Sequence, residues 1–385
     1  MKFSLGDEWS ELKKFESLAQ DEKDIVFYSE NQNSLLVFES LIEELTTEYE
    51  LKICYVTSSK NELNLMKSKK HVKTFYIGDG VVRTKFFLNL RAKIMIMTMP
   101  DLETFHIKRS KVYPVHYVYM FHSMVSTHLV YQKSAFDNFD TIMCVGDYHL
   151  QEIRNTEKIY NLKPKNLIKY GYAHLDNLLK KYSEKIIETR SNHKSNVLLA
   201  PSWGKDGIFE TIAEEVIDIL LKNNYKVTFR PHPMSQKNSK KKIEKIMEKF
   251  SNTSDLLFED NILDFDSFLS SDVMITDWSG SALEFAFAFN KPVLFIDVPK
   301  KSNNPEFERI SLTPIEISIR EKIGKILSPN NLNLLHNEIQ TLIEETNQFK
   351  PQILEIRNEM IFNIKESKKH GVESIIKLLN KESVS

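Results

Sequence analysis

Cysteine is almost absent from this chain of 385 residues, which has only Cys54 and Cys144. Each lies inside a short apolar run typical of a β-strand, so we expect two buried free thiols and neither a disulfide nor a metal-binding pair. Such sparse use of cysteine is typical of a reducing compartment, and the sequence therefore predicts a cytoplasmic location.

The chain also lacks net charge and long apolar runs. Its formal net charge is −1 at pH 7, so no overall field draws it to nucleic acid or to an anionic membrane. No uninterrupted apolar run approaches membrane-spanning length, and no apolar signal core follows the N-terminus. We expect a soluble protein, with basic runs at 67–71 and 237–249 leaving peripheral contact with a membrane open as an alternative.

Several motifs of nucleotide and metal chemistry are missing. The sequence has no Gly-x-Ser-x-Gly elbow, no Walker loop and no complete glycine-rich dinucleotide fingerprint. Its histidines show no zinc spacing. Asp264 and Asp266 form the acid-x-acid pattern of metal-dependent glycosyltransferases, but their stretch has helical apolar spacing, so we expect them at the surface or at a helix cap. No metal and no cofactor is predicted.

What the chain does contain is two series of short apolar runs alternating with helical stretches, which predicts an α/β fold with two parallel sheets. The expected strands are 25–28, 51–57, 72–77, 93–97, 115–121 and 141–145, then 197–200, 226–229, 256–258, 273–276 and 293–297. This layout predicts two Rossmann-like domains facing a cleft, as in GT-B glycosyltransferases. We place an acceptor-side domain at 1–190, a linker at 191–195, a nucleotide-donor domain at 195–330 and C-terminal helices at 331–385, with an N-terminal helix over 1–24.

The stretch 271–289 is the centre of the predicted chemistry. An apolar strand ends at Thr276, a turn through Gly280 follows, and Ser281 and Glu284 have the spacing of a capping box at the start of a helix. Unpaired N–H groups and the helix dipole make such a turn a site for an anion, most simply a phosphate. An ordinary strand-to-helix turn remains the alternative.

Polar residues follow other strands at the edge where ligands of open α/β sheets bind. Arg230 and His232 come directly after a strand, and Pro231 and Pro233 keep the residues before them extended. A fork of guanidinium donors beside a directed imidazole N–H suits a pyrophosphate. The alternative is that Arg230 pairs with a neighbouring acid.

Three further positions follow the same reasoning. His122 lies at a strand exit, where a neutral imidazole would take a proton from an acceptor hydroxyl. Ser202 lies at another exit and would contact substrate. We expect His116, within a strand, to be structural, and leave the role of His128 open.

Together these strand exits resemble the CDP-glycerol glycerophosphotransferase family, which builds poly(glycerol phosphate) teichoic acids and capsule polymers. The family's Thr-Asp-Tyr-Ser-Ser-x-x-Phe-Asp-Phe is similar to Thr276–Phe285, and its Arg-x-His-Pro matches Arg230–Pro233. Its Tyr-Ala-Pro-Thr resembles Leu199–Ser202, and its Trp-His-Gly-Thr resembles Phe121–Met124. The likeness spans roughly residues 110 to 300.

The resemblance implies transfer of glycerol phosphate from CDP-glycerol, or of a similar polyol phosphate from a related CDP-polyol, to the hydroxyl of a lipid-linked or polymer acceptor, with release of CMP. It implies that His122 and His232 are catalytic, with His122 as the base, and that no metal is required. The residues it assigns to the donor are Arg230, Ser202, Asp277, Ser279, Gly280, Ser281 and Glu284. For Glu284, a ribose hydroxyl and closure of the capping box both stay open.

The chain departs from the family pattern at several positions. Ser123 stands where the family has glycine, Gly280 replaces its second serine, Gly204 replaces an arginine, and a lysine soon after His122 is missing. CDP-ribitol fits as well as CDP-glycerol. Two alternatives are a GT-B glycosyltransferase that uses a nucleotide sugar, and a non-catalytic nucleotide-binding partner in a polymer-assembly complex. The acceptor and the oligomeric state are not predicted.

Overall fold

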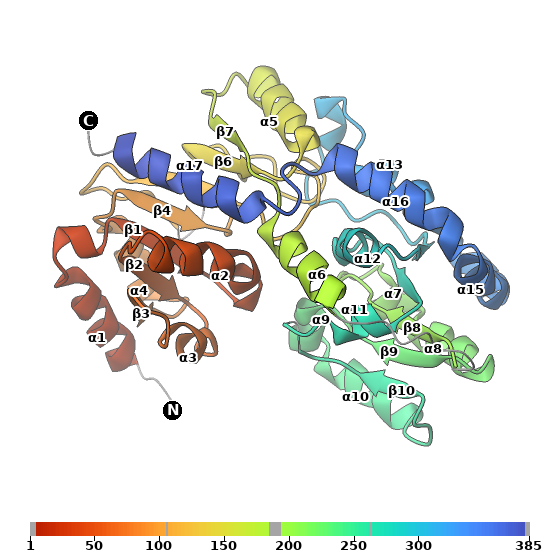
Figure 1. Cartoon of the computed structure of the whole chain (residues 1–385). Helices are drawn as coiled ribbons and strands as arrows, with labels where there is room; N and C mark the ends of the chain where they lie inside the picture. The colour runs from red at the N-terminus through yellow and green to blue at the C-terminus, as the bar shows by residue number, and fades with distance from the viewer. Residues whose placement is uncertain (1–4, 105–106, 185–193, 262, 382–385) are drawn as a thin grey trace.

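The computed structural model describes residues 5–104, 107–184, 194–261 and 263–381, which form two parallel sheets flanked by helices (Figure 1). The strands of the first sheet are β1 Ile25–Ser29, β2 Ile53–Thr57, β3 Val72–Tyr76, β4 Ile94–Met97, β5 His116–Met120, β6 Thr141–Cys144 and β7 Asn166–Lys169. Those of the second are β8 Asn196–Leu199, β9 Lys226–Phe229, β10 Leu256–Phe258, β11 Val273–Thr276, β12 Val293–Ile296 and β13 Gly324–Leu327. We call the parts built on these sheets the N-terminal and C-terminal units.

Each sheet is doubly wound, with its first strand near the middle. The spatial orders are β3-β2-β1-β4-β5-β6-β7 and β10-β9-β8-β11-β12-β13. Helices cover both faces, so the central strands are buried throughout and read in the sequence as continuous apolar runs. The predicted two-sheet α/β fold is confirmed, and both cysteines are buried free thiols as expected.

The helices of the N-terminal unit are α1 Leu5–Glu16, α2 Gln32–Thr47, α3 Glu62–Met66, α4 Val81–Leu88, α5 Asp147–Tyr160 and α6 Ala173–Glu184. Those that follow are α7 Ile208–Thr211, α8 Ala213–Lys222, α9 Pro233–Asn238, α10 Lys240–Lys249, α11 Asp266–Ser270, α12 Ser281–Phe289, α13 Ile315–Ser318, α14 Arg320–Ile323, α15 Leu335–Glu344, α16 Thr346–Met360 and α17 Ser367–Lys381. None of the helices described is long and apolar enough to cross a membrane.

Some sequence expectations need correction. Strands β7 and β13 were not predicted, because both lie at sheet edges and carry partly exposed rather than continuously apolar residues. The expected N-terminal helix ends at Glu16, and its first four residues, like 191–193 of the expected linker, lie outside the described part of the chain. At the start of α11 the Asp264 carboxylate accepts the Asp266 N–H at 2.9 Å; Phe265 is the N-cap, and Asp266 is exposed, in line with the surface position expected as one of two alternatives.

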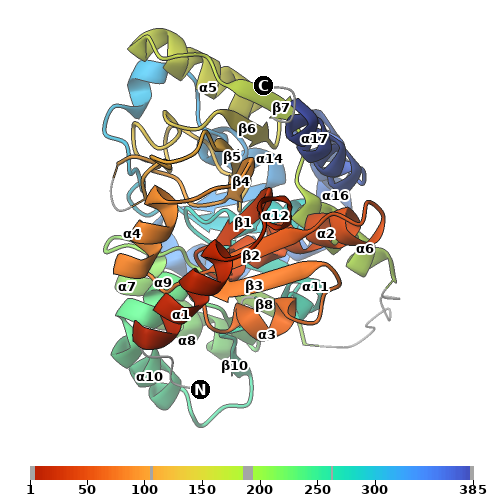
Figure 2. The same ribbon diagram turned by 90° about the vertical axis from the view of Figure 1, so that its left-hand side faces the viewer.

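The C-terminal helices connect the two units. Helix α16 packs against α12 and α14 of the C-terminal unit, and α17 packs against α2 and α6 of the N-terminal unit (Figures 1 and 2). Arg357 donates to the Phe287 carbonyl oxygen at 2.8 Å, and Lys368 pairs with Glu44 at 2.8 Å. The end of the chain therefore holds both units from one side.

A second connection, which we call the clasp, joins residues 302–316 of the C-terminal unit to the 126–133 loop and α5 of the N-terminal unit. The Asn303 N–H donates to the Leu129 carbonyl oxygen at 3.0 Å, and the Asn304 side chain donates to the His128 carbonyl oxygen at 2.9 Å. The 126–133 loop begins four residues after His122, so the clasp fixes the two units next to a predicted catalytic residue.

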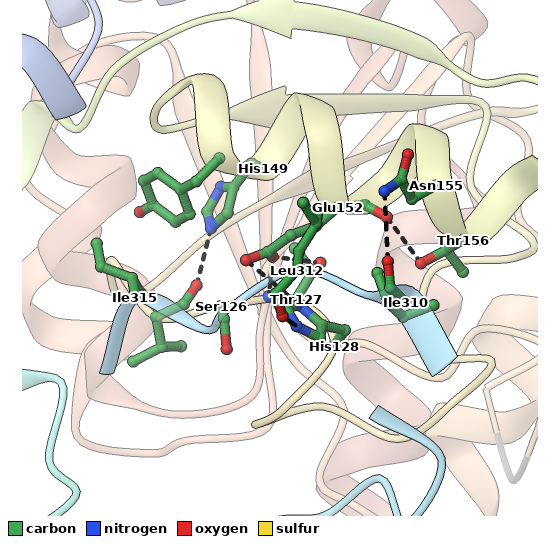
Figure 3. Close-up of polar contacts among 12 residues, drawn as sticks. Ser126, Thr127, His128, His149, Glu152, Asn155, Thr156, Ile310, Leu312 and Ile315 are labelled. Carbon is green, nitrogen blue, oxygen red and sulfur yellow. Dashed lines mark hydrogen bonds and ion pairs between the residues drawn. The ribbon is translucent and has the colours of Figure 1, made fainter. Parts of the chain in front are cut away.

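Buried ionisable groups lie at the centre of the clasp. Figure 3 shows His128 and Glu152 side by side, with His128 Nδ1 3.3 Å from Glu152 Oε1 and its Nε2 3.1 Å from the Leu312 carbonyl oxygen. The other oxygen of Glu152 accepts the N–H and the hydroxyl of Thr127 at 2.6 and 2.7 Å. His128, whose role the sequence left open, therefore fastens the clasp and does not line the cleft.

Glu316 is the second buried acid of the clasp. Its Oε1 accepts the Ser126 N–H at 2.7 Å, whereas its Oε2 is buried without a hydrogen-bond partner among the described residues. Burial raises the pKa of Glu316 to about 7, and the nearby Glu152 charge adds to this shift. A carboxyl that is neutral in the folded protein fits this site best.

We predict that Glu316→Gln stabilises the protein at pH 8 more than at pH 5.5. Because the folded pKa lies above the usual 4.5, the stability contributed by the protonated carboxyl is complete below pH 4.5 and is lost as pH rises through 7. Between pH 5.5 and pH 8 the difference corresponds to on the order of 2 kcal/mol. Melting temperatures at the two pH values test this.

Glu306→Gln is the matched control in the same clasp. Hydrogen bonds from Lys133 and Arg309 lower the pKa of Glu306 to about 2, so its contribution is already complete at pH 5.5 and its loss should be equal at both pH values. A Glu316→Gln effect that does not change between pH 5.5 and pH 8 would contradict the assignment of a neutral acid.

Candidate functional site

A cleft of about 350 Å³ lies between the two units, at the carboxyl ends of strands from both sheets. The N-terminal unit contributes the exits of β1 and β5, and the C-terminal unit those of β8, β9, β11 and β12. Eight of the predicted site residues line it, namely His122, Ser202, Arg230, His232, Ser279, Gly280, Ser281 and Glu284. Residues predicted from four separate strand exits therefore do come together.

Arg230 lines the cleft but is already paired. Its guanidinium forms a hydrogen-bonded ion pair with Glu259 and donates to the Asp264 carbonyl oxygen at 2.6 Å. The guanidinium carbon also lies 5.3 and 5.2 Å from the ring centroids of Phe265 and Phe268. The acidic partner that the sequence left as an alternative is thus present, and much of the Arg230 charge is neutralised before any ligand binds.

His232 is held as a neutral hydrogen-bond donor. It forms the N-cap of α9, and its Nδ1 accepts the Met234 N–H at 3.1 Å. The neutral ring therefore carries its proton on Nε2. Burial lowers the pKa of His232 to about 4, with further contributions from Lys301 and His122. At pH 7 this imidazole can donate one hydrogen bond into the cleft without carrying charge.

His122 lies on the opposite wall of the cleft, directly after β5. Burial lowers its pKa below the usual 6.5, although a hydrogen bond with the Thr98 backbone opposes the shift. Its carbonyl oxygen lies 2.9 Å from the Tyr172 hydroxyl, which fixes the backbone at this strand exit. An imidazole that is unprotonated at neutral pH can accept a proton from a hydroxyl group.

Glu284 does not close the predicted capping box. The side chain leaves the N-terminal turn of α12 and places Oε1 3.0 Å from the Tyr172 hydroxyl, across the gap between the units. Ser279 Oγ lies 3.4 Å from the Ser281 N–H instead, and Gly280 is the N-cap. Burial raises the pKa of Glu284 to about 7. A contact with the other unit has outcompeted a local hydrogen bond.

Asp277 lies behind the cleft wall instead of facing a ligand. It is buried, and its two carboxylate oxygens accept the N–H groups of Ser202 at 2.7 Å and Ile208 at 3.0 Å. A third bond, at 2.8 Å, comes from the Trp278 N–H. This carboxylate therefore ties the exit of β8 and the start of α7 to the exit of β11, which positions Ser202.

Gly280 allows a close approach of the two units. A Cβ atom at this position would overlap Ser123 Oγ and come within 2.8 Å of Val125 Cγ1. The two departures from the family pattern thus touch one another: a serine has been lost on one wall, and a serine on the opposite wall fills the space. Sequence comparison alone shows two separate changes, whereas the fold makes them one complementary pair.

Among the cleft residues that sequence reasoning missed are Trp203, Trp278 and Lys301. The Trp278 indole N–H donates to the Val298 carbonyl oxygen at 3.0 Å, and Lys301 Nζ lies 3.8 Å from the centroid of the Trp203 ring. Lys301 follows β12 by a few residues, so the strand-exit argument applied to Val293–Asp297 would have found it. His116 is within β5, 2.8 Å from Thr141 Oγ1, and is structural as expected.

Comparison with known proteins identifies the family that this chain matches. The sequence pattern of the CDP-glycerol:poly(glycerophosphate) glycerophosphotransferases matches residues 12–301. The minor teichoic acid biosynthesis protein GgaB of Bacillus subtilis is 29% identical over 168 residues, which cover 37% of this chain and 17% of that protein. The teichoic acid glycerol-phosphate primase of the same organism is 27% identical over 178 residues, 44% of each protein. The matched region spans less than half the length of either relative.

Solved structures agree with the fold. The wall teichoic acid polymerase TagF, in a crystal soaked with CDPG, superposes with a TM-score of 0.62 and 12% identity over 98% of this chain and 95% of that one. The UDP-GlcNAc 2-epimerase of Methanocaldococcus jannaschii, bound to UDP-GlcNAc and UDP, superposes with a TM-score of 0.59 and 12% identity over 93% and 99%. The predicted GT-B arrangement is confirmed.

We predict that Gly280→Ser destabilises the protein and that adding Ser123→Gly restores most of the loss. The single change forces a new side chain against Ser123 and Val125, and overpacking of this kind costs about 1–3 kcal/mol. The double variant removes the obstructing hydroxyl. Melting temperatures of both single variants and the double variant form a double-mutant cycle. Strictly additive effects would show that the two residues do not share one space.

Proposed function

The chain belongs to the CDP-glycerol:poly(glycerophosphate) glycerophosphotransferase family, and on this premise we propose that it transfers glycerol phosphate from CDP-glycerol to an acceptor hydroxyl. The observation that carries the proposal is the convergence in one cleft of two neutral imidazoles from opposite units, His122 and His232, beside the N-terminal turn of α12. A related CDP-activated polyol would fit the same geometry.

In the proposed complex the donor lies on the C-terminal unit. Its diphosphate contacts the Ser279–Ser281 turn, where the hydroxyls of Ser279 and Ser281 lie 2.8 Å apart and the helix dipole favours negative charge. His232 Nε2–H donates to a phosphate oxygen. Ser202, positioned by Asp277, lies on the same wall.

The acceptor enters from the N-terminal unit, whose Asn33, Leu36 and His122 line the other side of the cleft. Its hydroxyl oxygen attacks the phosphorus that carries glycerol and passes its proton to His122. The bond between that phosphorus and the bridging oxygen breaks, and CMP leaves with the electron pair. Such in-line displacement needs alignment and charge stabilisation more than covalent participation by the protein.

We also propose that the reaction serves teichoic-acid or capsule synthesis, with a lipid-linked or polymer acceptor. The names of the two Bacillus subtilis relatives support this assignment. A cytoplasmic protein that contacts the inner face of the membrane peripherally would meet such an acceptor. The basic helix α10, over Lys240–Lys249, is a candidate for that contact.

We expect purified protein to release CMP from CDP-glycerol when given a glycerol-phosphate acceptor. His122→Ala should lower the rate by about 10²–10⁴-fold, the usual contribution of a general base, while donor binding persists. His370→Ala is the matched control, since His370 is a partly exposed residue of α17 outside the cleft. If a UDP-sugar raises the melting temperature and CDP-glycerol neither binds nor reacts, the donor assignment is wrong.

The pH dependence gives a separate test of the base. Because burial lowers the pKa of His122 below 6.5, we expect kcat/KM to rise as this imidazole loses its proton, with a midpoint below 6.5. Measurement between pH 5 and 7 on wild type and His122→Ala checks this. The residual activity of the variant should lack that rising limb, and a limb that survives the substitution would assign it to another group.

A further inference from the structure

The motif residues that line the cleft supply little unpaired positive charge. Arg230 is paired with Glu259. His232, with a pKa lowered to about 4, and His122, with a pKa lowered below 6.5, are both neutral at pH 7. A nucleoside diphosphate ester carries two negative charges, and buried phosphates require charged or strongly polarised donors. The motif residues alone leave this charge only partly balanced.

Lys301 brings a cation into the same cleft from the end of β12. Its Nζ lies 3.8 Å from the centroid of the Trp203 ring, within the range of a cation–π contact. Among the described residues it forms no ion pair, in contrast to Arg230. The cation–π contact holds the ammonium group at the cleft wall, and the buried Asp277 carboxylate, which accepts three backbone N–H groups, acts on it only from beyond ion-pair distance.

The stem of Lys301 lies beside Gly204, and the backbone two residues later is hydrogen-bonded to the N-terminal unit. Its Cδ lies 4.0 Å from where a Cβ atom of Gly204 would be, and Gly204 has a φ of +136°, which disfavours a side chain at that position. Directly after Lys301 the clasp begins, with the Asn303 side chain donating to the Val130 carbonyl oxygen at 2.7 Å. Gly204 replaces the arginine of the family pattern, and the Lys301 stem occupies the space beside it.

We propose that Lys301 is the cation that binds the diphosphate of the nucleotide donor, with Trp203 holding its ammonium group at the cleft wall until the ligand enters. This inference rests on the proposed function, because it takes a nucleoside diphosphate ester as the ligand. Lys301 thereby supplies from β12 the charge that is absent at position 204 and that Arg230 shares with Glu259.

The protonation of Lys301 provides a distinctive signature. Burial lowers the pKa of Lys301 to about 8, with Asp277 opposing the shift. His232, which is neutral above pH 7, lies near it, and Glu284, with a pKa of about 7, lines the same cleft. A bound diphosphate favours the charged amine, so binding above pH 8 takes up a proton and affinity falls as pH rises.

The test uses Lys301→Met, Lys301→Arg and the control Lys300→Met in the full chain. Lys300 Nζ lies 4.3 Å from the centroid of the Phe307 ring, and this residue is not among those that line the cleft. Isothermal titration calorimetry with CDP-glycerol, CDP, pyrophosphate and cytidine gives the affinities. We expect Lys301→Met to weaken the three phosphate ligands about 10–100-fold, with cytidine unchanged and Lys300→Met matching wild type.

The pH series separates charge from packing. Between pH 7 and 9 the affinity of wild type for CDP-glycerol should fall more steeply than that of Lys301→Arg, because guanidinium does not titrate there, whereas Glu284, with a pKa of about 7, ionises alike in both proteins. Folding of each variant is checked by its melting temperature. Retention of full diphosphate affinity in Lys301→Met, or an equal loss in Lys300→Met, would overturn the inference while leaving turnover of CDP-glycerol intact.

The two proposals fail in different ways. If wild type binds CDP and pyrophosphate through Lys301 but neither binds nor converts CDP-glycerol, the donor assignment is wrong and the Lys301 site stands. If wild type binds none of the phosphate ligands, both are overturned.

Discussion

The hydrogen bonds between residues 302–316 and the 126–133 loop help to hold the two sheets with their strand exits around one cleft, and the site depends on that contact. Each sheet by itself presents strand exits to solvent. The clasp on one side and helices α16 and α17 on the other bring His122 opposite His232 across a cleft of about 350 Å³. The clasp also begins directly after Lys301, so the same contact that joins the units positions a cation.

Burial determines the charge state of the groups inside this frame. It lowers the pKa of His232 to about 4 and raises that of Glu284 to about 7. In both cases removal from water favours the neutral form. The cleft therefore offers neutral hydrogen-bond donors and acceptors from its motif residues, and a base that is unprotonated at neutral pH. The remaining charge comes from Lys301 and from Arg230, whose guanidinium is shared with Glu259.

Two glycines that depart from the family pattern, Gly280 and Gly204, are explained by a neighbouring residue from a distant part of the chain. Gly280 removes a side chain where Ser123 crosses from the other unit, and Gly204 leaves a surface along which the Lys301 stem runs. In both pairs the partners come from distant parts of the chain. Each glycine reads in the sequence as the loss of a functional side chain, whereas in the fold each lies beside a side chain from elsewhere: a Cβ atom at Gly280 would overlap Ser123, and one at Gly204 would lie 4.0 Å from the Lys301 stem.

The sequence by itself determined the strands, their exits and the residues carried there. Apolar runs mark the strands, and Pro231, Pro233 and Gly280 mark where strands end; both are local signals. Parallel strands of one sheet then bring their carboxyl ends to one edge. Edge strands β7 and β13 were not predicted, because their partly exposed residues interrupt the apolar pattern.

Only the tertiary structure decided what each exit residue contacts. Glu284 reaches Tyr172 instead of closing its own helix cap, Asp277 turns inward to three backbone N–H groups, and Arg230 meets Glu259. These outcomes depend on the packing of segments that lie far apart in the chain. Local spacing in the sequence does not predict that packing. A side chain's partner depends on which buried polar groups still need a hydrogen bond once the two units pack together.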